Sequence, residues 1–339
     1  MDVFALTRAL VDLDSTTGRE TPAVDFLFAR LSLLATRQDG RAERMPVAPG
    51  RDNILVTFGD PVVTLSTHID TVPPFLPARE DALFIHGRGS SDAKGIIAAM
   101  VGAAEELLDE GVRNFALLFV VGEERDSAGA KAAAAEPRGS RFLINGEPTE
   151  NKLALGAKGA LRYELTARGK LAHSAYPELG HSAIHDLLDL LGELRQLPLP
   201  SDPLLGSATL NIGTISGGRA PNVVADEARA EIMFRTVGDP GEIRAAVRRL
   251  SGNRVEVQEL LHSAAMRLEA HGGLPTTTVA FTTDIPIFDG TWGRPFLIGP
   301  GSIHLAHTAE ERVAKAELNE AVAIYKRMVG QLLANGPRP

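Results

Sequence analysis

The chain carries imidazole and carboxylate side chains at the ends of short apolar runs. One of these groups, Asp92, stands between a glycine-rich loop and the apolar run from 95 to 108. Similar groups follow other apolar runs: His68, Asp70, Glu123, Glu124 and Glu147. Apolar runs that stop at such groups place them at the carboxyl ends of strands, where a parallel sheet usually holds its chemistry. Because imidazole and carboxylate bind zinc and similar divalent ions, the pattern indicates a metal site.

Each of these signals is weak when it is taken alone. His68 with Asp70 fits an ordinary hydrogen-bonded pair, and Glu123 with Glu124 fits a solvated turn. Asp92 is also suited to capping the helix that follows it. The joint pattern is harder to explain in these ways, because several potential ligands share one α/β domain with a spare carboxylate. A site that activates water needs such a spare base.

Alternating segments of helical and strand length predict the elements that position these groups. The predicted helices cover 2–12, 20–36, 95–108, 127–135 and 310–333. The predicted strands cover 53–58, 62–66, 115–121, 141–144, 278–281 and 295–298, with the first two as neighbours. Thr308 and Glu311 have capping-box spacing, so His307 is expected just before the last helix. Strands that alternate with helices predict a doubly wound α/β domain.

A second pattern begins after Pro148. It predicts, in order, a strand, a helix, two strands, a helix and a strand, over 161–167, 183–194, 209–216, 228–235, 241–250 and 254–258. This βαββαβ order is the split βαβ, or ferredoxin-like, sandwich. The predicted domains are therefore a catalytic domain at 1–157 and 265–339 with an inserted domain at 158–264.

Composition excludes several classes of protein. The chain has 339 residues, 44% of them hydrophobic, and a formal net charge of −8, which argues against a nucleic-acid partner. There is no cysteine, so a metal is left to His, Asp and Glu, and a cytoplasmic location is expected. No run approaches about 18 apolar residues, so no membrane span is expected.

Five motifs stand in the order and spacing of one known family: HID at 68–70, GRGSSDAKG at 87–95, GEE at 122–124, GEPT at 146–149 and AHT at 306–308. In these motifs the chain resembles the M20 metallopeptidase family, which includes acetylornithine deacetylase, succinyl-diaminopimelate desuccinylase and glutamate carboxypeptidase. The resemblance covers nearly the whole chain, including AHSA at 172–175 and PNVV at 221–224 in the inserted domain.

The resemblance implies a site with two zinc ions, for which Co²⁺ or Mn²⁺ could substitute. Asp92 would bridge them; the remaining ligands would be His68 with Glu147 on one ion and Glu124 with His307 on the other. Asp70 would hydrogen-bond His68 and fix its tautomer, and Glu123 would be the general base. His304 is a rival for the ligand position of His307. A cis peptide bond between Asp92 and Ala93 is also implied.

The resemblance implies substrate contacts as well. Arg235 would bind a substrate carboxylate, although a structural salt bridge is an alternative, and the loop containing Gly301 would offer backbone donors. His173 would reach the metals of a neighbouring subunit and stabilise the oxyanion, with Asn222 as a companion donor. A homodimer formed by the inserted domains is therefore expected, although a histidine without catalytic duty is the simpler interpretation of His173.

The predicted function is a dizinc amidohydrolase for a small-molecule substrate. It would cleave the amide bond of an N-acyl amino acid or short peptide that carries a free carboxylate. One alternative is a di- or tripeptidase on the same scaffold, and another is a non-catalytic, metal-binding regulatory homologue. The sequence does not identify the acyl group or the amino-acid side chain, because these depend on the shape of the pocket.

Overall fold

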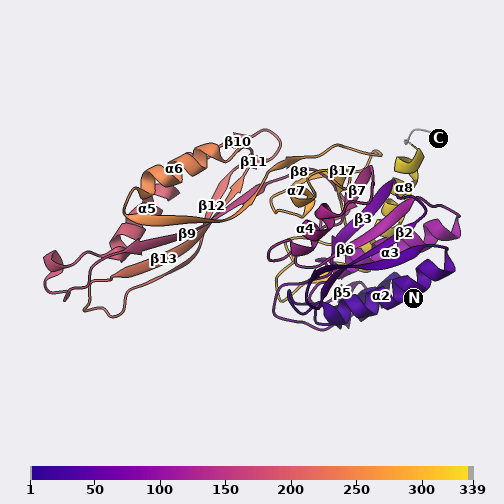
Figure 1. Ribbon diagram of the computed structural model, residues 1–339, viewed down its shortest axis with the longest axis horizontal. Coiled ribbons are helices and arrows are strands. Elements are labelled where there is room, and N and C mark those ends of the chain that lie inside the picture. The colour runs from indigo at the N-terminus through magenta and orange to yellow at the C-terminus, as the bar shows by residue number, and fades with distance from the viewer. Residues whose placement is uncertain (1, 335–339) are drawn as a thin grey trace. The chain divides into compact units, whose positions relative to one another are not determined.

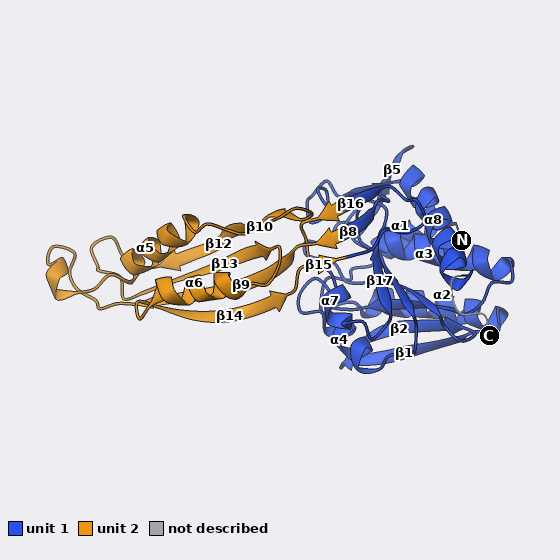
Figure 2. Ribbon diagram, turned by 90° about the horizontal axis from the view of Figure 1, so that it is seen from above, with its two compact units in different colours: residues 1–155, 268–277, 283–339 blue, residues 156–267, 278–282 orange. Residues whose placement is uncertain are grey.

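The structure is a computed structural model that describes residues 2–334. The chain divides into two compact units, shown in different colours in Figure 2. Unit 1 spans Met1–Leu155, Leu268–Thr277 and Thr283–Pro339, and unit 2 spans Gly156–Arg267 and Thr278–Thr282. Unit 2 is therefore an insertion, because the chain leaves unit 1 to build it and then returns.

A six-stranded sheet forms the centre of unit 1, in the order β1-β2-β6-β3-β7-β17. Its strands are β1 (Arg41–Ala48), β2 (Arg51–Phe58), β3 (Val63–His68), β6 (Phe115–Val120), β7 (Phe142–Asn145) and β17 (Arg294–Leu297). β3 pairs in parallel with β6 and β7, and β7 pairs in parallel with β17. β2 pairs antiparallel with β1 and β6. The carboxyl ends of β3, β6, β7 and β17 therefore share one edge of the sheet.

Helices cover both faces of this sheet (Figure 1). Alternate residues of a strand point to opposite faces. On β6 the odd-numbered residues, Phe115, Leu117 and Phe119, join a core cluster with the helices α1 (Val3–Val11), α2 (Thr21–Arg37), α3 (Lys94–Asp109) and α8 (Lys315–Ala334). The even-numbered residues, Ala116, Leu118 and Val120, join a cluster with α4 (Ala128–Ala135) and α7 (Ile285–Phe288). Burial on both faces explains why these strands are continuous apolar runs.

Unit 2 is a four-stranded antiparallel sheet with two helices on one face. The sheet order is β12-β13-β9-β14. The strands are β9 (Gly159–Arg168), β12 (Thr209–Gly217), β13 (Glu227–Thr236) and β14 (Val255–Ser263). The helices α5 (Ala183–Arg195) and α6 (Gly241–Ser251) pack their apolar sides against this sheet. The predicted fold class, a doubly wound α/β unit with an inserted βαββαβ unit, is confirmed.

The remaining elements are short. A small sheet in the order β18-β5-β4 lies in unit 1, formed by β4 (Arg79–Glu80), β5 (Phe84–His86) and β18 (Arg312–Ala314). The others are β8 (Leu153–Ala157), β10 (Ser201–Asp202), β11 (Gly206–Ser207), β15 (Met266–Arg267), β16 (Thr276–Val279) and a 3₁₀ turn at Pro177–Leu179.

Two predictions about the elements are wrong, and one strand was missed. The strands predicted at 53–58 and 62–66 are not neighbours, because β6 lies between β2 and β3 and pairs with both. Strand β1 was not predicted. The last helix begins at Lys315 rather than 310, because Arg312–Ala314 pair with β5 as strand β18. Glu311 is therefore not the residue of a capping box.

Candidate active site

The ends of three parallel strands bring the predicted ligands together. His68 is the last residue of β3, Glu123 and Glu124 lie just after β6, and Glu147 lies two residues after β7. β3 is paired in parallel with both neighbours, so the three turns that follow these strands meet at one edge of the sheet.

The carboxylate of Asp92 lies between two imidazoles. Its Oδ1 is 2.9 Å from Nε2 of His68, and its Oδ2 is 3.4 Å from Nε2 of His307. Asp92 does not cap helix α3, whose N-cap is Ala93 without a side-chain hydrogen bond. The peptide bond between Asp92 and Ala93 is cis, as predicted. Each oxygen of the buried carboxylate thus faces a different potential metal ligand.

Two glutamates complete this cluster. Glu124 Oε1 is 3.0 Å from His307 Nε2, and Glu147 Oε2 is 4.0 Å from His68 Nε2. Ligand atoms of His68, Asp92 and Glu124 all lie within 4.8 Å of one another. The buried Oε1 of Glu147 has no hydrogen-bond partner among residues 2–334. A buried oxygen without a partner, beside other acceptors, fits coordination of a cation.

The electrostatics of the cluster favour positive charge. Burial raises the pKa of Glu147 well above its usual value, and it also raises the pKa of Glu124. Hydrogen bonds to Asp92 and Glu124 raise the pKa of His307 to about 10. Burial alone would lower the pKa of His68, but Asp92 and Glu147 raise it well above the usual value. The residues therefore fit divalent cations, which supply the positive charge that these carboxylates require.

The tautomer of His68 is suited to metal binding. Nδ1 lies 2.9 Å from the backbone carbonyl oxygen of Asp70, which can only accept a hydrogen bond. Nδ1 therefore carries a proton, so a cation that replaced the proton on Nε2 would find the ring lone pair at the atom beside Asp92. Fixing the second ring nitrogen in this way is usual for histidine ligands.

The carboxylate of Asp70 has a different role from the predicted one. Its Oδ1 is 3.7 Å from His68 Nδ1, too far for a hydrogen bond, so the backbone carbonyl of Asp70 orients His68 instead. The carboxylate accepts hydrogen bonds from the backbone N–H groups of Gly122, Glu123 and Glu124, at 2.8, 3.0 and 3.3 Å. It therefore holds the turn that carries the predicted base and one predicted ligand.

Glu123 is the one acidic residue of the GEE motif that contacts neither histidine. Its side chain is half-buried and makes no hydrogen bond within the described part of the chain. Burial, followed by the charge of Glu147, raises its pKa well above the usual value. A carboxylate with a raised pKa and no partner is free to accept a proton from water.

The structure distinguishes His307 from its rival. His307 contacts both Asp92 and Glu124. His304 is exposed, and it pairs with neither Asp92 nor Glu124 within residues 2–334. The backbone of His307 has φ 64°, so the chain turns sharply where the imidazole enters the cluster. His307 is therefore the histidine that the fold brings to the site.

Comparison with known proteins identifies the family. A family model described as Peptidase family M20/M25/M40 matches residues 64–331. The chain belongs to the M20 peptidase family. It is accordingly a hydrolase of the kind that acts on peptide bonds.

The relatives of this M20 chain are similar over most of their length. A peptidase M20 domain-containing protein of Schizosaccharomyces pombe is 40% identical over 338 residues, with 97% of this chain and 84% of that protein covered. A probable carboxypeptidase of Aspergillus terreus is 37% identical over 371 residues, with 95% and 84% covered. An M20 family metallo-carboxypeptidase of Sulfolobus solfataricus has the same fold, with a TM-score of 0.80 at 16% identity over 98% of this chain and 99% of that one.

Two predicted residues of unit 2 lie side by side. His173 forms an isolated bridge with Val223, and Ser174 N–H donates to the carbonyl of Asn222. His173 and Asn222 are both exposed. Nδ1 of His173 accepts the N–H of Ala175 at 3.1 Å, which leaves Nε2 as the donor of a neutral ring. This corner of unit 2 thus presents one imidazole donor and one amide to solvent.

Arg235 and Gly301 differ in how far they are free to bind substrate. Arg235 lies on β13, is half-buried, and forms no ion pair within the described residues; burial lowers its pKa. The N–H of Gly301 already donates to Glu317 at 2.8 Å. Gly301 has φ +88°, and a side chain there would collide with Ser91. Close packing beside the Asp92 loop therefore accounts for this glycine, and a substrate would have to compete with Glu317 for its N–H.

Sequence reasoning missed two buried acids in unit 1. Glu311 binds the loop that carries Asp92. Asp284 is 1% exposed, and neither of its carboxylate oxygens has a hydrogen-bond partner of normal geometry within 2–334. Asp284 adds to the negative charge that raises the pKa of Glu123 and of Glu147. The sequence pattern around each acid does not indicate its role, because the residues that surround it in the fold come from distant segments of the chain.

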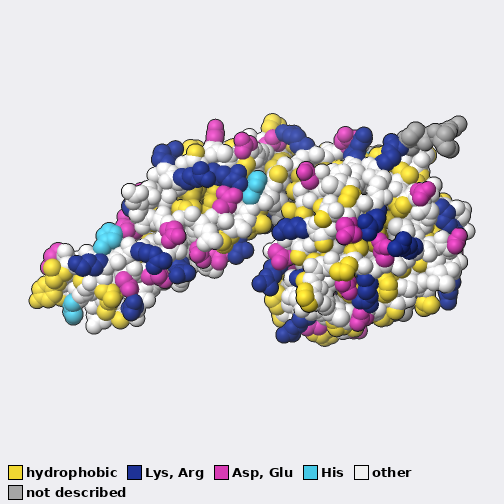
Figure 3. Space-filling view, in the orientation of Figure 1, with side chains coloured by type: hydrophobic (Ala, Val, Ile, Leu, Met, Phe, Trp, Pro, Cys, Tyr) yellow, Lys and Arg dark blue, Asp and Glu magenta, His cyan; other side chains and the backbone are white. Residues whose placement is uncertain are grey.

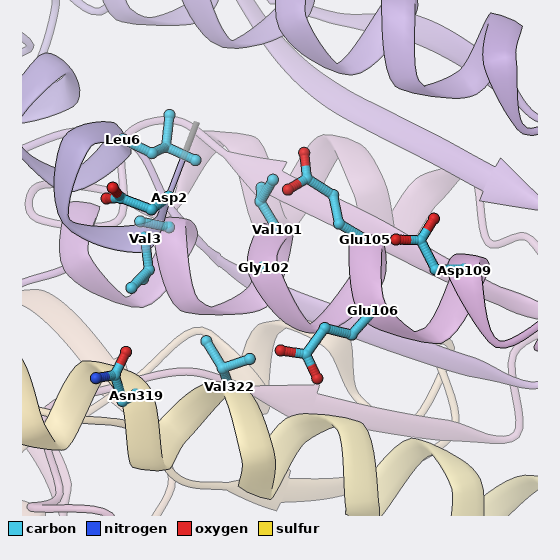
Figure 4. Close-up of a pocket in the computed structure, with 11 residues that line it drawn as sticks. Asp2, Val3, Leu6, Val101, Gly102, Glu105, Glu106, Asp109, Asn319 and Val322 are labelled. Carbon is cyan, nitrogen blue, oxygen red and sulfur yellow. The ribbon is translucent and has the colours of Figure 1, made fainter.

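A surface pocket of about 530 Å³ lies elsewhere on unit 1, between α1, α3 and α8 (Figure 4). None of the predicted site residues lines it. Three of its four acids have structural partners: Asp2 caps α1, Glu105 pairs with Arg30, and Glu106 pairs with Lys326. The fourth, Asp109, lines the pocket without an ion pair among residues 2–334. Separately, none of the helices within 2–334 combines the length and apolar character that crossing a bilayer requires.

Proposed function

We propose that this M20 hydrolase is a two-metal carboxypeptidase or deacylase that cleaves the amide bond of an N-acyl amino acid or short peptide with a free carboxylate. The observation that carries the proposal is the Asp92 carboxylate, whose two oxygens face the Nε2 atoms of His68 and His307. A carboxylate in that position is suited to bridging two cations. The name of the Aspergillus terreus relative, a probable carboxypeptidase, supports the substrate class.

The proposed ligands form two sets around Asp92. His68 and Glu147 would hold one ion, and Glu124 and His307 would hold the other. Zinc suits this set of nitrogen and oxygen ligands, and Co²⁺ or Mn²⁺ are possible substitutes. The ions, when bound, would supply Lewis acidity that activates a water molecule and polarises the scissile carbonyl.

Protein side chains would perform the remaining steps. Glu123 would take a proton from water and deliver it to the leaving amine, since its carboxylate makes no hydrogen bond among residues 2–334. Arg235, which forms no ion pair within the part of the chain that the structure describes, would bind the carboxylate of the substrate. His173 and Asn222 would donate to the oxyanion of the tetrahedral intermediate.

We also propose a homodimer in which His173 serves the partner's site. The loop around His173 exposes apolar side chains, with Leu171 44%, Tyr176 60% and Leu179 62% exposed. Figure 3 shows hydrophobic side chains gathered at one end of unit 2, at the left of the view. Exposed apolar patches on a soluble unit mark interaction surfaces.

A substrate screen with defined metal loading tests the proposal. Protein reconstituted with Zn²⁺, Co²⁺ or Mn²⁺ is assayed with N-acetyl and N-succinyl amino acids, dipeptides, tripeptides and the C-terminal amides of each. We expect two ions per chain and release of the C-terminal amino acid from N-acyl substrates with a free carboxylate. Cleavage only of peptides with a free amino terminus would favour a di- or tripeptidase. Full metal content without any hydrolysis would favour a regulatory homologue.

A further inference from the structure

The carboxylate of Glu311 accepts hydrogen bonds from four donors of one loop. Its Oε1 accepts the backbone N–H groups of Gly89, Ser91 and Asp92, at 2.9, 3.2 and 3.2 Å. Its Oε2 accepts the guanidinium of Arg88 at 2.5 Å. Glu311 is 1% exposed and Arg88 is 2% exposed, so water does not share these contacts.

The backbone of the loop is shaped around this carboxylate. Gly87 and Gly89 have φ values of +132° and +86°, which turn the chain so that successive N–H groups face inward. The N–H of Gly87 also donates to the backbone carbonyl of Glu311, at 3.0 Å. Without an anion at this point, three backbone N–H groups would be buried without an acceptor, which costs about 1 to 3 kcal/mol for each group. The guanidinium of Arg88 would keep only the backbone carbonyl of Pro74, at 3.3 Å.

These contacts end at the residue whose orientation matters most for the cluster. The N–H of Asp92 donates to Glu311, while the carboxylate of the same residue faces His68 and His307. A shift of the loop would move the Asp92 oxygens relative to both imidazoles. Among the hydrogen bonds of residues 2–334, no other bond from this loop holds the backbone of Asp92.

We propose that Glu311 is a positioning residue of the metal site, which sets the place of Asp92 by holding its loop through three backbone N–H groups and Arg88. The inference rests on the proposed function, because it assumes that Asp92 binds metal. Outer groups of this kind typically change metal affinity by about 10- to 100-fold when they are removed. Glu311 itself contacts neither imidazole and is not a ligand.

The first test measures Co²⁺ affinity, by competition with a chromophoric chelator, and the Co²⁺ absorption spectrum. In Glu311→Gln the amide nitrogen faces the guanidinium of Arg88, donor against donor, so the loop has to shift. We expect Co²⁺ to bind about 10- to 100-fold more weakly, with an altered spectrum. In the double variant Glu311→Gln with Arg88→Met, the amide oxygen keeps the three backbone donors without this conflict, so most of the lost affinity returns.

A matched control separates positioning from general stability. Glu259→Gln removes a carboxylate in unit 2 that accepts two hydrogen bonds from Arg244, at 2.9 and 2.7 Å, and one from Tyr163, at 3.2 Å. The hydrogen-bond partners of Glu259 both lie in unit 2, so the Co²⁺ affinity of this variant should equal that of the wild type even if its unfolding temperature falls.

Three results would overturn the assignment. The first is wild-type Co²⁺ affinity in a folded Glu311→Gln protein. The second is an equal loss of affinity in the single and double variants. The third applies if the single variant does not fold: it is a double variant that folds but still binds Co²⁺ weakly. These results differ from failure of the proposed function, which would show as a wild-type protein that binds metal but releases no amino acid from any substrate.

Discussion

The carboxylate of Asp70 accepts a hydrogen bond from the backbone N–H of Glu123 at 3.0 Å, which ties the end of β3 to the turn after β6. The same carboxylate accepts the N–H of Gly122 at 2.8 Å and the hydroxyl of Thr17 at 2.7 Å. Asp70 is fully buried, so the turn that carries Glu123 is held by a charged acceptor out of contact with water. This arrangement fixes the place of the proposed base without restricting its side chain.

The first prediction is that Asp70→Asn lowers kcat more than it changes KM. An amide nitrogen in place of one carboxylate oxygen would oppose a backbone N–H, donor against donor, and displace Glu123. We expect kcat to fall by about 10- to 100-fold with metal content retained. Thr17→Val, which removes only the hydroxyl contact at 2.7 Å, is the matched control and should lose much less. An Asp70→Asn protein with wild-type kcat would exclude this role.

The second prediction separates the two glutamates of the turn. Glu123→Gln should keep about two ions per chain and lose about 10²- to 10⁴-fold of turnover, because the base is not a ligand. Glu124→Gln should lose metal, because Glu124 lies 3.0 Å from His307 within the cluster. Metal analysis and steady-state kinetics on both variants check this. If the Glu123 variant lost metal and kept activity, the two roles would have to be exchanged.

The third prediction concerns pH and the buried Asp284. Burial raises its pKa from 3.8 to about 6, and Ser127 opposes this rise only in part. The folded chain therefore binds this proton more tightly than the unfolded chain does. Stability falls as pH rises from about 4 to about 6 and stays reduced above that, at a cost of about 1 to 3 kcal/mol. Asp284→Asn should remove this cost.

Denaturant unfolding with a metal chelator present measures the effect of Asp284→Asn. The variant should exceed the wild type in stability by about 1 to 3 kcal/mol at neutral pH, and the gap should close below about pH 4. Equal stability of the two proteins at neutral pH would show that the charge of Asp284 is compensated within the fold.

The fourth prediction tests Arg235 as the group that binds the substrate carboxylate. Lysine keeps the charge but not the planar, two-pronged geometry that matches a carboxylate. Arg235→Lys should lower kcat/KM for substrates with a free carboxylate by about 10- to 100-fold. The matching C-terminal amides should be affected much less. Equal losses for acids and amides would leave Arg235 with a structural role only.

That the fold gathers the predicted ligands could be inferred in part from the sequence, because three of them follow strands. His68, Glu124 and Glu147 each follow an apolar run, and parallel pairing of β3 with β6 and β7 brings those runs to one edge. The order of the strands was harder to predict from the sequence, because the short turn between β2 and β3 favours a hairpin. Both strands are buried, and β6 lies between them and pairs with each.

The role of Glu311 could not be predicted from its sequence neighbours. Its spacing from Thr308 matches a capping box, and this local pattern gives no sign of Asp92, which lies 219 positions earlier. The contact that decides its function is a set of backbone N–H groups, and these have no signature in the side-chain sequence. Asp284 was missed for a similar reason, because burial of a carboxylate depends on tertiary packing.

The last prediction concerns His173 and a homodimer with sites completed in trans. The Nε2 of His173 is a free donor, because Nδ1 accepts the N–H of Ala175, and the ring is exposed on unit 2. A donor aimed at an oxyanion is typically worth about 3 to 4 kcal/mol, or roughly 10²- to 10³-fold in kcat. We therefore expect His173→Ala and Glu123→Ala proteins to be nearly inactive when each is assayed alone.

Mixing the two inactive proteins distinguishes action in trans from action in cis. In a mixed dimer, the chain with intact Glu123 receives His173 from its partner, so one working site forms per mixed dimer. After subunit exchange, half of the dimers should be mixed, and activity should return to about a quarter of the wild-type value per chain. Exchange is measured separately with differently tagged chains. A mixture that exchanges subunits and stays inactive, or an active protein that sediments as a monomer, would refute the trans assignment of His173.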